Sequence, residues 1–178
     1  MLEIRKALLT DIPALLDLIN SYAANGIMLP RTEFEMAENI RDFLVACDHN
    51  RKVVGTGALH FYTPGSGEVR SLAVEPGQKT HGIGRSLVEA LEAEARQNDL
   101  HSLFAFTYVD KFFHKLGFEE VNRDELPLKA WKDCLRCPKF QACDEIAMLK
   151  RLKPGPVPRV DSPLLQISEI PLLPLVRK

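Results

Sequence analysis

One stretch decides the fold of this 178-residue chain: Gly67-Glu-Val-Arg-Ser-Leu-Ala-Val-Glu-Pro-Gly-Gln-Lys-Thr-His-Gly-Ile-Gly84. Its first half alternates as a β-strand does, a polar loop follows, and Gly82 and Gly84 open a helix. Backbone N–H groups and the dipole at a helix start favour an anion, and glycines let the backbone approach it closely. The stretch therefore predicts a strand, a loop and a helix that together bind a phosphorylated ligand.

The composition is that of an ordinary globular protein, with 46% hydrophobic residues, 26% charged residues and a formal net charge of -1. This charge gives no support to a nucleic-acid or acidic membrane partner. The N-terminus is charged and no apolar run is long enough to span a bilayer, so we predict a cytoplasmic protein.

The length predicts one domain at 1–153. A Pro- and Leu-rich tail at 154–178 is too apolar for simple disorder, and its prolines exclude a helix. We expect it to lie extended across the domain or on a neighbouring subunit, and a homodimer stays open.

Two helices are predicted ahead of the central stretch. The first begins at Thr10 as its N-cap, and its apolar residues at helical spacing face the core. The second opens with the capping box Thr32-x-x-Glu35 and has an apolar face of Met36, Ile40, Phe43 and Leu44, and residues 43–46 run on toward a strand.

The other periodic segments predict strands at 2–5, 53–62, 68–74, 103–108, 118–121 and 146–152, and helices at 83–97 and 109–116. A further helical region begins at Leu126. The strand–helix–strand order around Gly82 implies one parallel pair with a right-handed crossover. The fold class is α/β (α+β), with a mixed, mostly antiparallel twisted sheet flanked by helices.

Three motifs in this order resemble the GNAT acetyltransferases: Leu72-Ala-Val-Glu-Pro, Lys79-x-x-Gly82-x-Gly84 and Phe112-Phe-His-Lys-Leu-Gly117-Phe118. The resemblance covers about residues 2–152 and implies the GNAT fold, with acetyl-CoA as cosubstrate and no metal in catalysis. It places the cosubstrate on Leu72, Ala73, Val74, Lys79, Thr80, His81, Gly82, Ile83, Gly84, Arg85 and Phe113. Lys79 stands where the family usually has Arg or Gln, and Phe113 stands where it often has a Tyr acid.

A narrower resemblance is to the short bacterial N-acetylglutamate synthases, through Leu29-Pro-Arg31, Val53-Val-Gly-x-Gly-Ala-Leu-His60, Gly67-Glu-Val-Arg70 and His81-Gly-Ile-Gly84. It implies acetylation of the α-amine of L-glutamate, the first step of arginine biosynthesis. Two alternatives stay open: a GNAT acting on another amine, such as a polyamine, an antibiotic or a protein N-terminus, and a non-catalytic acetyl-CoA sensor.

Acetyl transfer needs a base, because an α-ammonium is largely protonated at neutral pH. Glu68 stands at the position of the family's general base, and its alternative is a strand-surface glutamate paired with Arg70. Period-2 alternation places Glu68, Arg70, Leu72 and Val74 on one face of the strand. The Val74 N–H is the expected donor to the thioester carbonyl. Tyr108 is the candidate substitute for the missing acid, or a core or cleft-lining tyrosine.

Arginine forks suit the two carboxylates of glutamate, and Arg31 and Arg70 are the arginines we select, with Lys111 as a weaker third. His60 is interpreted mainly as a strand-packing histidine. His81 lies in the phosphate loop and adds a donor.

Three cysteines gather as Cys134-x-x-Cys137 and Cys143. They resemble half of a zinc or iron–sulfur site, but a fourth ligand would have to come from elsewhere. The alternative, a local cluster of reduced thiols, is our interpretation, and no metal site is predicted.

Overall fold

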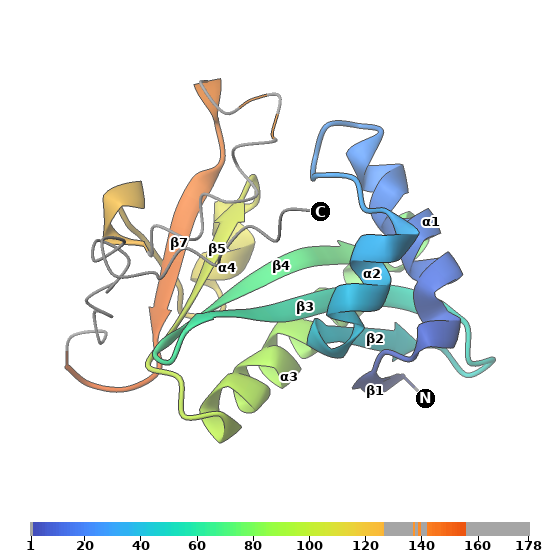
Figure 1. Ribbon diagram of the computed structural model, residues 1–178, viewed down its shortest axis with the longest axis horizontal. Helices are drawn as coiled ribbons and strands as arrows, with labels where there is room; N and C mark the ends of the chain where they lie inside the picture. The colour runs from blue at the N-terminus through green and yellow to red at the C-terminus, as the bar shows by residue number, and fades with distance from the viewer. Residues whose placement is uncertain (1, 127–136, 138, 140–141, 156–178) are drawn as a thin grey trace, which may run out of the picture.

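A computed structural model describes residues 2–126, 137, 139 and 142–155, with the backbone alone at 79, 80 and 124. Its centre is a seven-stranded sheet in the order β1-β2-β3-β4-β5-β7-β6 (Figure 1). β4 and β5 run parallel, and every other neighbouring pair is antiparallel. The predicted mixed, mostly antiparallel sheet is confirmed. The helical region predicted beyond Leu126, residue Cys134 and the tail from 156 lie outside the described residues.

The strands are β1 (Glu3–Lys6), β2 (Phe43–Cys47), β3 (Val53–Thr63), β4 (Ser66–Val74), β5 (Ser102–Thr107), β6 (Glu119–Glu120) and β7 (Ile146–Arg151). The α-helices are α1 (Ile12–Ala23), α2 (Glu33–Asn39), α3 (Ile83–Gln97) and α4 (Asp110–His114). Short 3-10 turns are η1 (Leu9–Asp11), η2 (Ile40–Asp42), η3 (Pro76–His81) and η4 (Arg123–Glu125). No helix among the described residues is long and apolar enough to cross a membrane.

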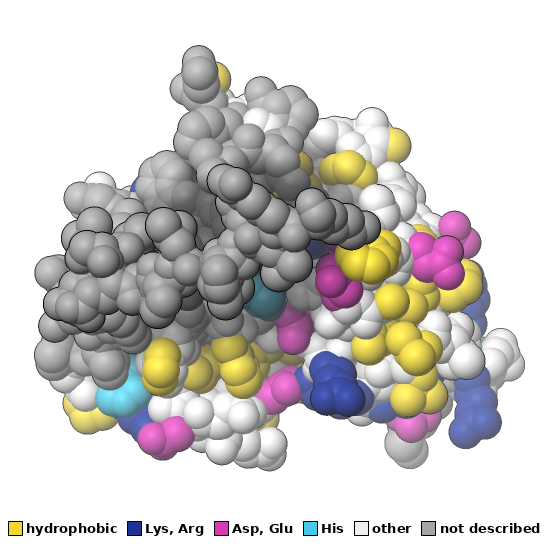
Figure 2. Space-filling model, viewed as in Figure 1, with side chains coloured by type: hydrophobic (Ala, Val, Ile, Leu, Met, Phe, Trp, Pro, Cys, Tyr) yellow, Lys and Arg dark blue, Asp and Glu magenta, His cyan; other side chains and the backbone are white. Residues whose placement is uncertain are grey.

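Helices cover both faces of the sheet, α3 on one and α1 with α2 on the other (Figure 1). The larger core lies under α3, whose inward residues are buried as the helical spacing predicts: Ile83, Leu87, Val88, Leu91 and Ala95. A second core under α1 and α2 holds Leu15, Ile19, Met36, Phe43 and Val45. Exposed hydrophobic side chains also gather over α1 and α2 (Figure 2). A sheet covered on both faces needs apolar side chains on both sides of its central strands.

The prediction for the end of the second helix is wrong, because a strand with apolar side chains on both faces resembles a buried helix. Phe43 and Leu44 do not extend the apolar face of the second helix, because α2 ends at Asn39 and both residues lie in β2. All five residues of β2 are buried, so the strand shows no alternation that distinguishes it from a buried helix. The capping box is confirmed: the Glu35 N–H donates to Thr32 Oγ1 (3.2 Å), and the Thr32 N–H donates to Glu35 Oε2 (2.9 Å).

The start of the first helix also differs from the prediction. Thr10 is not its N-cap but lies within η1, which precedes α1. Asp11 organises this turn, since its carboxylate accepts two hydrogen bonds from Arg5 (2.7 and 2.9 Å) and one from the Leu8 N–H (2.7 Å). The carboxylate therefore ties β1 to the entry of α1.

A β-bulge interrupts β4. Ser71 has a positive φ of 53°, and Ser71 and Leu72 together stand opposite the single residue Gly57 of β3. Two residues facing one is the definition of a bulge, and the extra residue reverses the alternation of side chains beyond it.

The bulge overturns the prediction that four β4 side chains share one face. Arg70 is paired with Ala58, which belongs to the core under α1 and α2, so Arg70 and Glu68 lie on that face. Beyond the bulge, Leu72 and Val74 pack in the core under α3. The charged half of β4 and its apolar end therefore serve opposite sides of the sheet.

β4 and β5 separate along their length. They are paired only from Ser66 with Ser102 to Glu68 with Phe104, while β5 continues against β7 to Thr107 (Figure 1). The last part of β4 therefore has no strand partner on its β5 side, and a V-shaped opening of the sheet begins beside Glu68.

Candidate active site

The backbone of Val74 faces the β4–β5 opening. Val74 is paired with Gly55, and the next N–H, that of Glu75, donates to the Val54 carbonyl (2.9 Å). Because hydrogen-bonded and non-hydrogen-bonded pairs alternate in an antiparallel ladder, the N–H and C=O of Val74 point away from β3. The Tyr22 hydroxyl of α1 donates to this C=O over 2.5 Å. The predicted oxyanion donor is thus oriented toward the opening.

The loop after β4 is where the sequence predicts an anion site. It follows η3 to Gly82, whose left-handed backbone (φ 73°) starts α3. A Cβ at Gly84 would lie 3.4 Å from the Phe112 ring, so this position is closely packed on one side. The His81 side chain is exposed, with Nδ1 3.4 Å from the Gln78 carbonyl. The start of α3 therefore offers backbone N–H groups and an exposed imidazole to a phosphate.

The other residues predicted for the cosubstrate differ in their exposure. Ala73, Ile83 and Phe113 are buried, and Phe113 stacks edge-to-face on Phe112 and Phe118, with ring centroids 5.3 and 5.1 Å away. Arg85 is exposed and lies 3.3 Å from Glu89. For Lys79 and Thr80 the structure describes the backbone alone, within η3.

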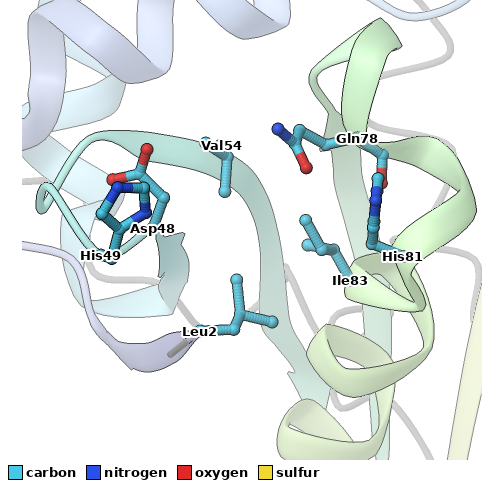
Figure 3. A pocket seen from close by; sticks show the side chains of 7 residues that line it. All are labelled: Leu2, Asp48, His49, Val54, Gln78, His81 and Ile83. Carbon is cyan, nitrogen blue, oxygen red and sulfur yellow. The ribbon is translucent and has the colours of Figure 1, made fainter.

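A cavity of about 200 Å³ flanks the phosphate loop on the side of the β2–β3 turn (Figure 3). It is lined by Leu2, Asp48, His49, Val54, Gln78, His81 and Ile83. No residue of β4 or β5 is among the residues that line this cavity. It is therefore separate from the β4–β5 opening.

Behind the opening, on the α1–α2 face, lies a group of charged side chains. Glu68 is buried, with 9% of its surface exposed, and stands directly opposite His60 of β3. His60 Nδ1 lies 2.6 Å from Asp42 Oδ2, and Arg70 Nη2 lies 3.7 Å from the same oxygen. The Arg70 side chain is only 10% exposed. Acid and base are thus brought together beside the end of the β4–β5 pairing.

The position of Arg31 is fixed through its backbone. The Asn20 side chain of α1 donates to the Arg31 carbonyl (3.0 Å) and accepts from the Arg31 N–H (2.9 Å). Asn20 precedes Tyr22 by less than one helical turn, so α1 fixes both the α1–α2 loop and the contact to Val74. Arg31 is half-buried in that loop.

Two predicted residues lie elsewhere. The Tyr108 hydroxyl donates to Asp144 Oδ1 (2.9 Å) and accepts from Lys139 Nζ (3.0 Å). Lys139 Nζ also lies 4.8 Å from the centroid of the Tyr108 ring. Burial raises the pKa of the Tyr108 hydroxyl. Within the described part of the chain, this hydroxyl bonds to Lys139 and Asp144 rather than to the face that carries Glu68. Lys111 is exposed on α4.

The cysteine cluster is described only in part. Cys137 and Cys143 are free thiols, and Arg123 Nη2 lies 3.1 Å from the Cys143 sulfur. No group of three potential ligands is present among the described residues, and Cys134 is outside them.

The sequence prediction did not select Tyr22 or Asp42, and it interpreted His60 mainly as a packing residue. Tyr22 falls at helical spacing on the apolar stripe of the first predicted helix, and Asp42 lies within the second predicted helix as an ordinary polar residue. Their partners lie 52 and 18 residues away in the chain, and no local pattern reports such contacts. The only signal was the Gly-x-Gly-Ala-Leu-His60 motif itself.

The parallel strands β4 and β5 separate, and β4 leads through a loop to α3, which begins after Gly82. This arrangement is the one expected of a GNAT acetyltransferase, and comparison with known proteins agrees. The chain belongs to the acetyltransferase (GNAT) family, which matches it over residues 13–118. The sequence-based resemblance and the GNAT fold are confirmed.

Individual relatives extend this finding. An uncharacterized N-acetyltransferase of Chlorobaculum tepidum is 43% identical over 149 residues, which cover 84% of this chain and 96% of the relative. An amino-acid acetyltransferase of Mycobacterium tuberculosis is 34% identical, with 75% and 77% of the two chains covered. A similar solved structure is that of N-acetylglutamate synthase from Neisseria gonorrhoeae, complexed with coenzyme A and N-acetyl-glutamate. The TM-score is 0.78 and the sequence identity is 28%, and the match covers 86% of this chain and 36% of that one.

Proposed function

We propose that this protein transfers an acetyl group from acetyl-CoA to the α-amine of L-glutamate, as the first step of arginine biosynthesis in the cytoplasm. Acetyl-CoA is the cosubstrate of the GNAT family, to which the chain belongs. The observation that carries the choice of acceptor is the placement of Glu68, Arg70 and the Arg31 loop on the α1–α2 side of the opening. The amino-acid acetyltransferase relatives support the same choice.

The phosphate loop fits the pyrophosphate of the cosubstrate. Gly82 turns the chain so that the first N–H groups of α3 are presented together, and a helix start favours an anion. Acetyl-CoA supplies an activated acetyl thioester. The Val74 N–H, which points into the opening, is the donor for the oxygen that becomes negative during transfer.

Glu68 acts as the general base. An amine attacks only in its neutral form, and Glu68 is a buried residue at the last β4–β5 pair, where the opening begins. It removes the proton from the α-ammonium directly or through one water.

Arg70 and Arg31 bind the two carboxylates of the acceptor. A guanidinium forms two parallel hydrogen bonds with a carboxylate, and a nearly buried guanidinium such as that of Arg70 holds its partner in one orientation. A polyamine offers these two guanidinium groups no carboxylate to bind.

A separate acid is not required for the leaving group. Phe113 occupies the position of the family's tyrosine and is buried in the core. A thiol with a pKa of about 8.5 leaves readily as thiolate near neutral pH. Tyr108 remains a sequence-based prediction for this role, with its hydroxyl bonded to Asp144.

An acceptor screen with acetyl-CoA tests the proposal, with release of free thiol measured for L-glutamate, L-glutamine, L-aspartate and the other common amino acids. We expect turnover with L-glutamate, and Arg70→Gln should raise its KM about 10- to 100-fold, the value of a charge-assisted hydrogen bond. The matched control is Arg151→Gln, because Arg151 is exposed at the end of β7. This substitution should leave the KM for L-glutamate unchanged. Failure of glutamate, glutamine and aspartate alike would refute the substrate.

A further inference from the structure

His60 lies beside the proposed base. It is paired with Glu68 across β3 and β4, between the two register shifts, so both side chains project from the same face of the sheet. Side chains of directly opposed residues have Cβ atoms about 4.5–5.5 Å apart. An imidazole on this position is within reach of the Glu68 carboxylate, directly or through one water.

Asp42 fixes the orientation and tautomer of that imidazole. Its Oδ2 lies 2.6 Å from His60 Nδ1, and a carboxylate accepts only, so Nδ1 carries the hydrogen. The neutral ring then presents the lone pair of Nε2 on its opposite side. Arg70 Nη2 lies 3.7 Å from the same carboxylate oxygen, so it also contacts Asp42.

The proposed base is the least exposed of these groups. Glu68 is 9% exposed, while the side chains of His60 and Asp42 are 28% and 26% exposed. Among the described residues, the groups placed around His60 are Asp42 from η2, Glu68 and Arg70 from β4, and the Tyr62 ring on its own strand, 5.0 Å away. The imidazole therefore stands next to a buried carboxylate and is itself partly exposed to water.

Acetyl transfer from a thioester to an ammonium releases one proton in each turnover. An ammonium and an acetyl thioester give an amide, a thiol and one proton, so the nitrogen loses two protons in each turnover. One becomes the S–H of the released thiol. The other is taken by Glu68 and must leave it before the next turnover, although Glu68 itself is buried.

We propose that His60 is the proton relay of Glu68 and that Asp42 is its positioning residue. The proton passes from the acceptor nitrogen to Glu68, then to His60 Nε2, and from the imidazolium, paired with Asp42, to water, which restores the neutral ring. The proposal rests on Glu68 as the base of the proposed function, but it does not depend on glutamate as the acceptor.

Packing alone offers a different explanation for His60. Its ring stacks edge-to-face on Tyr62, which in turn lies 5.5 Å from the Phe104 ring. A packing role predicts lower stability on replacement, but it predicts no effect of buffer bases on turnover.

The test compares wild type, His60→Asn and the control His101→Asn with whichever acceptor the screen identifies. Asn places an amide where Nδ1 was and keeps the Asp42 bond, but it cannot carry a proton. In dilute non-imidazole buffer, kcat of His60→Asn should fall by about 10- to 100-fold, the lower part of the range for general acid–base groups. Added imidazole at constant ionic strength should raise kcat of this variant in a saturable manner and leave wild type and His101→Asn unchanged.

A kcat of His60→Asn equal to wild type, or a reduced kcat that imidazole does not restore, would overturn the relay. Asp42→Asn provides a second test and should show a smaller loss that imidazole also restores. Glu68→Gln separates the two proposals: if it stays active, the base assignment fails, and if it is inactive while His60→Asn is normal, only the relay fails. Thermal melting of each variant verifies that it is folded.

Discussion

Replacement of Gly82 by alanine tests the phosphate loop. Gly82 has φ 73° and ψ 5°, and a Cβ built there meets no described atom within 4 Å, so the effect of alanine is confined to the backbone. A non-glycine residue in the left-handed region costs about 1–2 kcal/mol. If the loop relaxes to avoid this cost, the N–H groups at the start of α3 turn away from the anion. The KM for acetyl-CoA should then rise by about 5- to 30-fold, since 1.4 kcal/mol corresponds to a factor of ten.

Gly84→Ala is the matched control. Gly84 lies in the first turn of α3, and its Cβ would contact the Phe112 ring at 3.4 Å, close to ordinary van der Waals distance. Alanine in a helix gains up to about 1 kcal/mol over glycine. The KM for acetyl-CoA, measured from free thiol at saturating acceptor, should therefore change by less than about threefold. Equal KM values for Gly82→Ala and wild type, or a larger effect of Gly84→Ala, would refute the assignment of the loop.

Two further predictions concern stability and the missing acid. The hydrogen bonds from Arg5 hold the pKa of Asp11 below its usual value, so this pair stabilises the fold above pH about 4 and loses its effect as the pH falls through the lowered pKa. Asp11→Asn should lower the free energy of unfolding by about 2–3 kcal/mol at pH 7 and by less at pH 3, measured in urea; an equal difference at both pH values would contradict this. Phe113→Tyr restores the family's acid, and kcat should stay within about threefold of wild type because the thiolate leaves unaided; a tenfold rise would show that the acid is needed.

Local sequence signals predicted the parts of the fold that depend on local chemistry. The apolar spacing of Ile83, Leu87 and Leu91 reports one buried helix face, and the Thr32–Glu35 box marks a helix start through its own side chains. The left-handed backbone at Gly82 agrees with the glycine of the motif, and the binding of the cosubstrate there stays a prediction.

The remaining features depend on tertiary context. The prediction that β4 side chains alternate strictly assumed a regular strand. The extra residue at Ser71 instead places Leu72 and Val74 on the face opposite to Glu68 and Arg70. Charge and motif correctly selected Glu68 and Arg70 as residues that lie together. Their surroundings, the Asp42–His60 pair and the Tyr22 contact to Val74, arise only when distant elements pack.

The central claim is that Glu68 removes a proton from the α-ammonium of L-glutamate on the α1–α2 face of the sheet. The most direct measurement is the rate of N-acetylglutamate formation from acetyl-CoA and L-glutamate by wild type and Glu68→Gln across a range of pH. We predict that the variant is at least about 100-fold slower near pH 7 and recovers about tenfold per pH unit as the amine loses its proton to solvent. Equal rates for both proteins at pH 7, or no N-acetylglutamate from the wild type, would contradict the account.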